Sequence, residues 1–353
     1  MSMVKLLAAS VAVTLGAGLA PSFAVPFNTF YVDAENGTDS GTCGGASLQT
    51  ASTGPCATLN QALQNAAAGN IIQVVRGGAF GPIYLNGTIS INGPTDKSLI
   101  IVNSAALPGC IGAAPGTCAA STTAGVEINA GSTDQVRLKD MIVSAGPAGT
   151  AAIQVDAAGG VSLTGVVGRG GTSTGTGAIL TATPSSGNLA LYIHNCDFGY
   201  SKTMGGVLLQ PSGSAGGAIE FSGGEIHHAV YGLQINANTT TGGLAGAFDT
   251  TQFFAFNNSA VSVAAQSSGF ARIVFSRSTI VNTGGAALKV NGANAAAEIY
   301  EDVFTGDGTG VNIVGGAQVT GFGNSAIHDN GTNCAVGGVP TACSTAITAA
   351  SMN

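Results

Sequence analysis

Pairs of apolar residues separated by a single residue recur through the second half of the chain, at steps of 23 to 28 residues. Alternation of this kind predicts a short strand with one buried face. Because the pairs return at a nearly constant step, one structural unit is being reused. The pairs are Val207/Leu209, Leu233/Ile235, Val261/Val263, Leu288/Val290 and Val311/Ile313.

A second apolar pattern keeps the same step. It has the form apolar, any residue, apolar, four residues, apolar, and its last position advances by 24 to 28 residues. Two patterns with one period, joined by segments rich in Gly, Asn and Ser, predict that each unit makes one circuit and returns above its own start. The members are Leu191/Ile193/Phe198, Ile219/Phe221/Ile226, Gly246/Phe248/Phe253, Ile273/Phe275/Ile280 and Ala297/Ile299/Phe304.

Other repeat architectures fit these segments less well. A helical solenoid needs segments of roughly 10 to 15 residues with a 3.6-residue period, whereas these are short, rich in Val, Ile and Phe, and interrupted by Gly. A propeller blade of about 40 residues would hold four strands, and a unit of about 26 residues has room for only three short ones. We therefore predict an all-β, single-domain parallel β-helix solenoid.

The composition narrows the possible partners. Only 8% of the residues are charged, and the formal net charge is −7. Nucleic-acid binding requires a basic surface, which this chain does not supply, so we expect no nucleic-acid partner. Stacked Val, Ile, Ala and Gly account for the apolar composition, and beyond residue 24 we expect no membrane span. The sequence leaves the oligomeric state open.

Residues 1–24 have the pattern of an export signal. Lys5 is the only charge, Leu6 to Ala20 is apolar, and Ser22 and Ala24 are small residues at the two positions that a signal peptidase reads. A membrane anchor is the alternative, but an apolar run of about 15 residues is short for a span of roughly 20. We expect cleavage near Ala24 and a secreted protein, extracellular or periplasmic.

The seven cysteines divide into three local pairs and one remainder. The paired cysteines lie 8 to 13 residues apart in segments rich in Gly, Pro, Ser and Thr, which favours local disulfides in an oxidising compartment. A zinc site is the weaker alternative, because there is no Cys-x-x-Cys pair and no nearby His. Cys196 lies inside a rung and is expected to be a buried free thiol. The expected pairs are Cys43 with Cys56, Cys110 with Cys118, and Cys334 with Cys343.

The segment before the repeats predicts a cap. A strand over 30–32 precedes a polar loop, and Ala57 to Ala67 has the pattern of a short amphipathic helix that Thr58 can cap. An open β-helix edge invites pairing with another chain unless it is covered, so we expect this helix to cover it. The expected organisation is a signal peptide at 1–24, N-terminal strand, loop and capping helix at 25–70, parallel β-helix at 71–330 and a C-terminal cap or tail at 331–353.

The same N-terminal segment resembles a known family. The stretches 31–33, 36–42, 55–63 and 68–74 are similar to the N-terminal signature of secreted right-handed parallel β-helix proteins with the pectin-lyase-like fold. The resemblance implies the right-handed sense of the solenoid. It implies no single activity, because the family includes polysaccharide lyases, hydrolases, epimerases, tailspikes and adhesins. The motifs of galacturonan hydrolases and pectate lyases are missing, so no catalytic residue carries over to this sequence.

One group of residues is a candidate catalytic or metal-binding site. Alignment of successive units on Phe198 and Ile226 places Asp197 and Glu225 at equivalent positions, about 5 Å apart on stacked strands. His194 and His227 are close to them in sequence. Two carboxylates at this separation could act as the acid and nucleophile of a retaining glycosidase, or could hold calcium. The alternative is a solvated surface in a turn.

Weaker candidates lie elsewhere. Asp33, Glu35 and Asp39 could chelate calcium in the N-terminal loop, although such polar loops usually reflect turn chemistry. An acidic cluster at 298–302 is expected to be exposed. Apart from calcium, we expect no cofactor. The outward positions of the first pattern are expected to contain no carboxylate, and are read as Gln154, Leu180, Leu208, Gln234, Ser262, Lys289 and Asn312.

The sequence is compatible with two functions. The chain has no Trp and six Tyr, so aromatic sugar platforms are scarce as well as charges. We therefore expect a secreted non-catalytic β-helix, an extracellular or envelope-associated structural or adhesive module that could bind a polysaccharide or cell-surface component weakly. The alternative is a polysaccharide lyase or glycoside hydrolase that uses Asp197 and Glu225.

Overall fold

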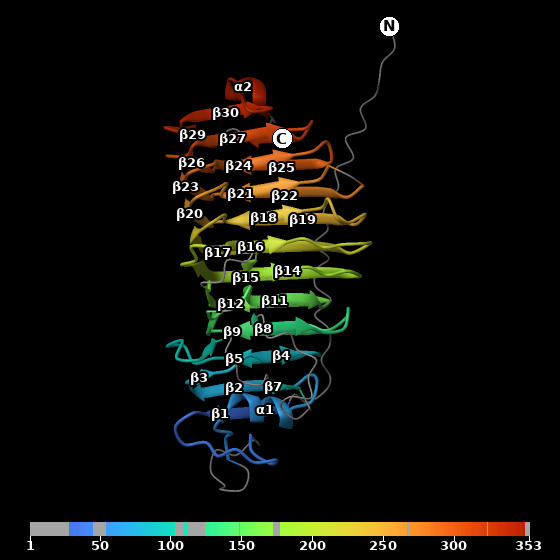
Figure 1. Ribbon diagram of the computed structural model, residues 1–353, viewed down its shortest axis with the longest axis vertical. Helices are drawn as coiled ribbons and strands as arrows, with labels where there is room; N and C mark the ends of the chain where they lie inside the picture. The colour runs from blue at the N-terminus through green and yellow to red at the C-terminus, as the bar shows by residue number, and fades with distance from the viewer. Residues whose placement is uncertain are drawn as a thin grey trace.

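The computed structural model describes residues 28–44, 54–102, 109–111, 124–147, 149–171, 177–266, 268–322 and 324–349. Over these residues the chain winds into a stack of short parallel strands along one long axis, with α1 near one end and α2 at the other (Figure 1). Each rung crosses a 20-stranded sheet, whose two halves on either side of a bend are called here the first and second sheets, and then a 12-stranded third sheet before the chain returns above its own start. The predicted all-β parallel β-helix is therefore confirmed.

The first sheet receives the opening strand of each rung. In the middle rungs the same strand continues through a bend, so β15 and β17 contribute to both the first and the second sheet. The strands of the first sheet are β1 Thr29–Asp33, β2 Ile71–Arg76, β5 Ile89–Asn92, β9 Gln135–Lys139, β12 Gly160–Thr164, the first part of β15 Asn188–Gly199, the first part of β17 Gly216–Ala229, β19 Gly243–Asp249, β22 Phe270–Ser276, β25 Ala295–Tyr300, β28 Gln318–Phe322 and β32 Thr348–Ala349.

The second sheet follows the first bend. It holds the last parts of β15 and β17 together with β3 Ala79–Phe80, β6 Ile100–Val102, β10 Ile142–Ser144, β13 Val167–Arg169, β20 Gln252–Phe256, β23 Thr279–Thr283, β26 Val303–Thr305 and β29 Ala326–His328.

The third sheet closes each circuit. Its strands are parallel except for the terminal pair β30 and β31, which is antiparallel. They are β4 Ile83–Leu85, β7 Gly109–Cys110, β8 Ala124–Asn129, β11 Ala151–Ala157, β14 Ala178–Ala182, β16 Gly205–Leu209, β18 Leu233–Asn236, β21 Val261–Ala264, β24 Ala286–Asn291, β27 Thr309–Val314, β30 Thr332–Val336 and β31 Val339–Pro340.

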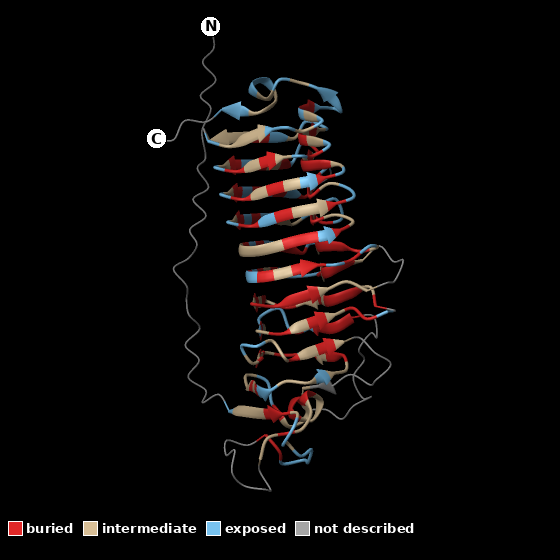
Figure 2. Cartoon of the chain, turned by 90° about the vertical axis from the view of Figure 1, so that its left-hand side faces the viewer, coloured by how far each residue is buried: buried red, intermediate tan, exposed pale blue. Residues whose placement is uncertain are grey.

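The predicted apolar ladders are the core of the stack. Val207 is in register with Leu233, which is in register with Val261, and the same pairing continues to Val311. The second pattern is also in register from rung to rung, and its phenylalanines are fully buried. Buried positions recur on successive strands along the stack (Figure 2). Both predicted ladders are confirmed.

Two register predictions are wrong by one residue. Leu180 pairs with Ile153 and Val207 and is buried, so Thr181 is the outward residue of that rung. For the last complete rung the sequence pattern predicts a turn with Thr320, Phe322 and Ile327 inward, but Val319 and Gly321 continue the inward positions of the first sheet.

The bends between sheets use left-handed backbone. At the first bend Asn195 has a φ of 50°, and its equivalents one and two rungs further along are Gly223 and Thr250. At the second bend Tyr200 and His228 have φ values of 59° and 46°. A single left-handed residue turns the chain sharply, so the strands that flank it can be very short.

The N-terminal helix is present where the sequence predicts one. α1 spans Leu59–Asn65, and the Thr58 hydroxyl accepts a hydrogen bond from the Gln61 N–H at 3.2 Å. The apolar face of α1 belongs to the same buried core as the strands, and the helix lies near the β1 end of the stack (Figure 1). β1 pairs in parallel with β2, so the sheet ladder already begins at Thr29.

Two of the predicted disulfides are present, Cys43–Cys56 and Cys334–Cys343. Cys118 lies outside the described residues, so its predicted bond to Cys110 stays a prediction. Cys196 is a buried free thiol, as expected, and burial raises its pKa to about 11. At the C-terminal end the second bond ties β30 to α2 Cys343–Ala346. Within the described part of the chain, no helix has the length and apolar content needed to cross a bilayer.

Candidate functional site

Asp197 and Glu225 lie side by side on the second sheet. They are register partners on the adjacent parallel strands β15 and β17, and their neighbours Phe198 and Ile226 point into the core. Side chains alternate between the faces of a sheet, so both carboxylates lie on the outer face. The predicted alignment is therefore confirmed, but the two residues stand on strands just after the first bend and are partly buried, not solvated in a turn.

Arg169 neutralises Asp197. Its Nη1 donates to Asp197 Oδ1 at 2.8 Å and its Nη2 donates to Oδ2 at 2.7 Å, which is the bidentate geometry of a strong ion pair. Both side chains are about one quarter exposed, 27% for Arg169 and 25% for Asp197. Arg169 comes from β13, one rung nearer the N-terminus.

His227 completes the cluster from the rung of Glu225. Its Nε2 lies 2.9 Å from Asp197 Oδ1 and 3.6 Å from Glu225 Oε1. The imidazole is almost completely buried, because its register partner Gly199 leaves room for the ring and the Phe254 ring stacks against it with a centroid distance of 4.8 Å. A Cβ on residue 199 would lie 2.4 Å from Cε1 of the imidazole.

An aromatic edge borders the cluster at the second bend. Tyr200 is 64% exposed, and its ring stacks on His228 at a centroid distance of 5.5 Å. The Arg169 guanidinium lies 5.0 Å from the centroid of the Tyr200 ring. His228 Nδ1 is 2.8 Å from His227 Nδ1, so the two imidazoles share a hydrogen bond. The left-handed bend residues thus place the Tyr200 ring beside Arg169 and the His228 imidazole beside His227.

The charges around Asp197 limit the catalytic roles that this carboxylate can take. Partial burial opposes ionisation of Asp197, but the hydrogen bonds and charges of Arg169 and His227 outweigh it and hold the pKa of that carboxyl well below its ordinary value. Asp197 therefore stays ionised and cannot serve as a general acid near neutral pH. Both of its oxygens already accept hydrogen bonds from Arg169, so it is a poor nucleophile as well.

His194 does not join the cluster. It lies before the first bend on the first sheet, where its Nδ1 is 3.0 Å from Ser222 Oγ and its Nε2 is 3.0 Å from Asn195 Nδ2. Of the four candidate catalytic residues, the structure brings together Asp197, Glu225 and His227 and leaves His194 apart.

The three calcium candidates of the N-terminal loop each have protein partners, and Arg76 pairs with both Asp33, at 3.9 Å, and Glu35. Asp33 accepts the backbone N–H groups of residues 35 and 36, which is turn chemistry. Glu35 pairs with Arg76 at 2.7 Å, and Asp39 accepts hydrogen bonds from the N–H and hydroxyl of Thr58. These carboxylates do not form a convergent group of ligand atoms in the described part of the chain.

Two groups of potential metal ligands converge among the described residues. Asp39 lies with Cys43 and Cys56, but those two sulfurs are joined in a disulfide and are not available as thiolates. The other group is Asp197, Glu225 and His227, whose ligand atoms all lie within 4.8 Å of one another.

The late acidic cluster differs from its prediction. Glu298 and Glu301 are exposed as expected, but Asp302 is fully buried. Its Oδ1 and Oδ2 accept hydrogen bonds, both at 2.8 Å, from the backbone N–H groups of Ser278 and Tyr300. Burial raises the pKa of Asp302 to about 7, against the opposing effect of these two donors. Asp302 therefore has a structural role at the first bend.

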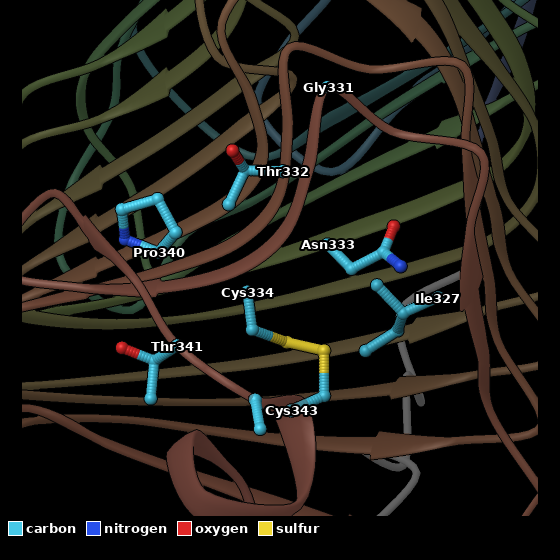
Figure 3. A pocket seen from close by; sticks show the side chains of 9 residues that line it. Ile327, Gly331, Thr332, Asn333, Cys334, Pro340, Thr341 and Cys343 are labelled. Atoms are coloured by element: carbon cyan, nitrogen blue, oxygen red, sulfur yellow. A yellow bond between two sulfur atoms is a disulfide. The ribbon is translucent and has the colours of Figure 1, made fainter.

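The C-terminal end of the stack contains a cavity. It measures about 590 Å³ and lies beside the Cys334–Cys343 disulfide, between β30 and the start of α2 (Figure 3). Its lining contains no acidic, basic or histidine side chain. This cavity therefore offers no general acid or base.

Arg169 and Tyr200 are the site residues that the sequence did not indicate. Arg169 is hidden because Gly168 occupies the inward position of its rung, where the Phe198 ring fills the space that a side chain would take. Alignment of Gly168 under Phe198 places Arg169 directly below Gly199. The third sheet also has a carboxylate that the prediction lacked, because Glu127 is in register with Gln154 on its outer face.

Comparisons with known proteins support the fold. No family model matches the chain, and no curated protein matches it. Among solved structures, it is similar to the crystal structure of the pectate lyase Pel9A, with a TM-score of 0.52 and 12% sequence identity, over 91% of this chain and 80% of that one. The pectin-lyase-like parallel β-helix is thus the fold of this chain. At this identity the likeness speaks for the fold alone.

Proposed function

We propose that this protein is a secreted, non-catalytic β-helix that binds a polysaccharide on the surface formed by Arg169, Asp197, Tyr200, Glu225 and His228. The observation that carries the proposal is the bidentate pairing of Asp197 with Arg169, since it neutralises the carboxylate that an acid–base mechanism would need. What remains exposed is a recognition surface. Structural or adhesive use of the rigid solenoid is compatible with binding at this surface.

The chemistry of the surface suits a sugar. The Tyr200 ring is exposed and amphipathic, and the side chain of Glu225, 39% exposed, offers acceptor oxygens beside His227, whose ring contacts Tyr200. Sugar rings present apolar C–H faces and hydroxyl donors, which an aromatic face and a carboxylate recognise together. One solved structure with a similar fold is a pectate lyase, which makes a polysaccharide the ligand class to examine first.

Secretion is part of the same proposal. The disulfides Cys43–Cys56 and Cys334–Cys343 favour an oxidising compartment, and the export signal expected at 1–24 would deliver the chain there. We propose that the mature protein begins near Val25 and meets its ligand in the periplasm or outside the cell.

Affinity electrophoresis of the purified mature protein in gels that contain acidic or neutral polysaccharides tests the proposal. At least one polymer should retard the wild type, and Tyr200→Ala should lose most of this retardation. Tyr192→Ala is the matched control, because Tyr192 is also an exposed tyrosine but lies on the first sheet, in register with Glu220. Equal retardation of both variants would remove Tyr200 and its surroundings from the proposal.

A polysaccharide lyase or glycoside hydrolase is the second candidate. The observation that favours it is the approach of Asp197, Glu225 and His227 to within 4.8 Å. Assays of reducing ends and of unsaturated products on the same polymers distinguish the two functions. Product that forms with the wild type and disappears in Glu225→Gln would establish the enzyme and overturn the non-catalytic proposal.

A further inference from the structure

We infer that Asp197, Glu225 and His227 form a binding site for a divalent transition-metal ion such as Zn²⁺. Their three ligand atoms converge on the outer face of the second sheet, two from β17 and one from β15. Because β15 and β17 are adjacent parallel strands paired in register, the ligands stand on a rigid support. The inference concerns the metal alone and does not require polysaccharide binding.

Two of the three distances between the ligand atoms match neighbouring positions of a coordination sphere, and the third, between Asp197 and Glu225, is at most 4.8 Å. Bonds of about 2.0 to 2.2 Å from zinc to nitrogen and oxygen place neighbouring ligand atoms roughly 2.8 to 3.6 Å apart in octahedral or tetrahedral geometry. His227 Nε2 lies 2.9 Å from Asp197 Oδ1 and 3.6 Å from Glu225 Oε1. Without a metal, a hydrogen bond between His227 and Asp197 holds the same atoms in place.

The imidazole is positioned before a metal binds. The Gly199 backbone, the stacked Phe254 ring and the edge of the Tyr200 ring enclose it, and only 3% of its side chain is exposed. Its second nitrogen, Nδ1, is hydrogen-bonded to His228 Nδ1 at 2.8 Å. A metal-binding histidine normally has such a partner on its other nitrogen, which fixes the ring orientation.

The donor set selects the kind of metal. Calcium prefers six to eight oxygen ligands, and imidazole nitrogen is a preferred ligand of zinc, copper and nickel. One nitrogen and two carboxylates therefore favour a transition metal over calcium. Arg169 pairs with Asp197 and reduces the negative charge of the site, which should moderate the affinity.

Metal titration of the purified mature protein, after treatment with a chelator, tests the inference. Calorimetry with Zn²⁺ and visible absorption with Co²⁺ should each show one saturable site per chain. Glu225→Gln should weaken binding at least tenfold, and His227→Gln should abolish it. Glu220→Gln is the matched control, since Glu220 lies on the same strand but on the exposed face of the first sheet, and it should bind as the wild type does.

Controls exclude binding at the two histidines outside the cluster. His194→Gln and His328→Gln should leave the affinity unchanged, because His194 lies on the first sheet, before the first bend, and His328 forms an exposed pair with Asp329. Ca²⁺ added in molar excess over Co²⁺ should not displace Co²⁺ from the site.

Three results would overturn the inference: no saturable binding of Zn²⁺ or Co²⁺, unchanged binding in Glu225→Gln, or preferential binding of Ca²⁺. If circular dichroism shows that His227→Gln does not fold, Glu225→Gln still decides, because its side chain is partly exposed and its replacement is isosteric.

Discussion

Two aspartates at the first bend, Asp197 in the middle of the stack and Asp302 near its C-terminal end, have opposite surroundings. Following the register from rung to rung, the position of Asp197 is occupied by Glu225, Gln252, Thr279 and finally Val303. Asp302 stands one residue earlier and so matches the buried Cys196. A shift of one residue moves a side chain to the other face of a strand, which is why one carboxylate points outward and the other inward.

The partners of the two carboxylates differ accordingly. Asp197 binds side chains, Arg169 and His227, which other residues could replace or compete for. Asp302 binds backbone N–H groups within a column of buried polar residues at the first bend. In this column each backbone N–H donates to a side-chain oxygen of the next rung: Thr251 N to Ser278 Oγ, Ser278 N to Asp302 Oδ1, and Asp302 N to Ser325 Oγ.

An acidic residue at a bend of a β-helix can therefore have either of two roles, depending on the face of the strand to which it points. In the middle rungs the outer face is free to build a binding surface, whereas at the late bends the carboxylates satisfy backbone donors that water cannot reach. The inward carboxyls should affect stability through protonation and backbone hydrogen bonds, and the outward cluster should affect it through ion pairing and packing. Four experiments test these contributions, in order of decreasing expected effect.

The largest effect is expected from the pH dependence of stability at Asp302. Its folded pKa of about 7 exceeds the ordinary value of 3.8, so between these values the folded protein holds a proton that the unfolded chain has released. The stabilisation is complete below about pH 4 and is lost as the pH rises through 7, by up to about 4 kcal/mol. Denaturant unfolding from pH 4 to 8 should show this slope in the wild type and not in Asp302→Asn.

Glu298→Gln is the control for that experiment, because Glu298 is exposed on a strand of the same rung and its variant should keep the slope. A wild-type slope in Asp302→Asn would show that the inward carboxyl does not hold the extra proton.

Gly199→Ala should have the next largest effect on stability. The added Cβ would occupy the place of the His227 ring, 2.4 Å from its Cε1, and the ring must move. Overpacking of this kind costs about 1 to 3 kcal/mol, measurable by denaturant unfolding. Gly87→Ala is the matched control, since its Cβ would meet only the Ala68 side chain at 3.4 Å. Equal stabilities of the two variants would mean that the site tolerates a displaced imidazole.

Arg169→Gln should have a smaller effect, about 1 to 2 kcal/mol, because it leaves the half-buried Asp197 without its counter-charge. Arg277 offers a matched control, since it also pairs with an aspartate, Asp249, but with 57% of its own side chain exposed. Exposed ion pairs contribute little, so unfolding of Arg277→Gln should match the wild type. A similar loss in both variants would contradict the distinction between the two pairs.

Asp307→Asn should stabilise the protein by about 0.5 to 1 kcal/mol. In the described part of the chain Asp307 Oδ2 is buried without a hydrogen-bond partner, and burial raises the pKa of this carboxyl. One rung later Asn330 occupies the same position, and its Nδ2 donates to the Phe304 carbonyl at 3.0 Å. An amide at 307 can make the equivalent bond to the Ile280 carbonyl and keep the Thr283 N–H bond.

Thermal unfolding at pH 8 measures the effect of Asp307→Asn, and Asp249→Asn, on an exposed pair, serves as the comparison. A lower midpoint for Asp307→Asn would mean that the ionised carboxylate is needed at this bend.

The sequence predicted the circuit of the chain because each rung repeats its inward apolar residues at nearly constant steps. The register of Asp197 with Glu225 followed directly from that period. The wrong register predictions arise at inward positions that are not occupied by a clearly apolar residue. Glycine stands there at Gly168 and Gly321, where Phe198 and Ile347 fill the space, and so the position of Arg169 and the last register were not evident.

Two other features depend on the third dimension. In residues 178–182 consecutive apolar side chains are buried, so alternation alone did not assign Leu180 to the inside. Asp302 was expected on the surface, because an aspartate in a bend usually is, and only the backbone donors of neighbouring rungs explain its burial.

The polar column at the first bend has a consequence for the length of the molecule. Each link of the column joins one rung to the next by the same type of bond, so an inserted copy of residues 252–278 would meet partners of the correct kind on both sides. Insertion of such a copy would lengthen the stack by one rung, about 4.8 Å, and leave the flanking rungs in register. Variation in size among chains built this way can therefore proceed in whole rungs, through duplication within the gene.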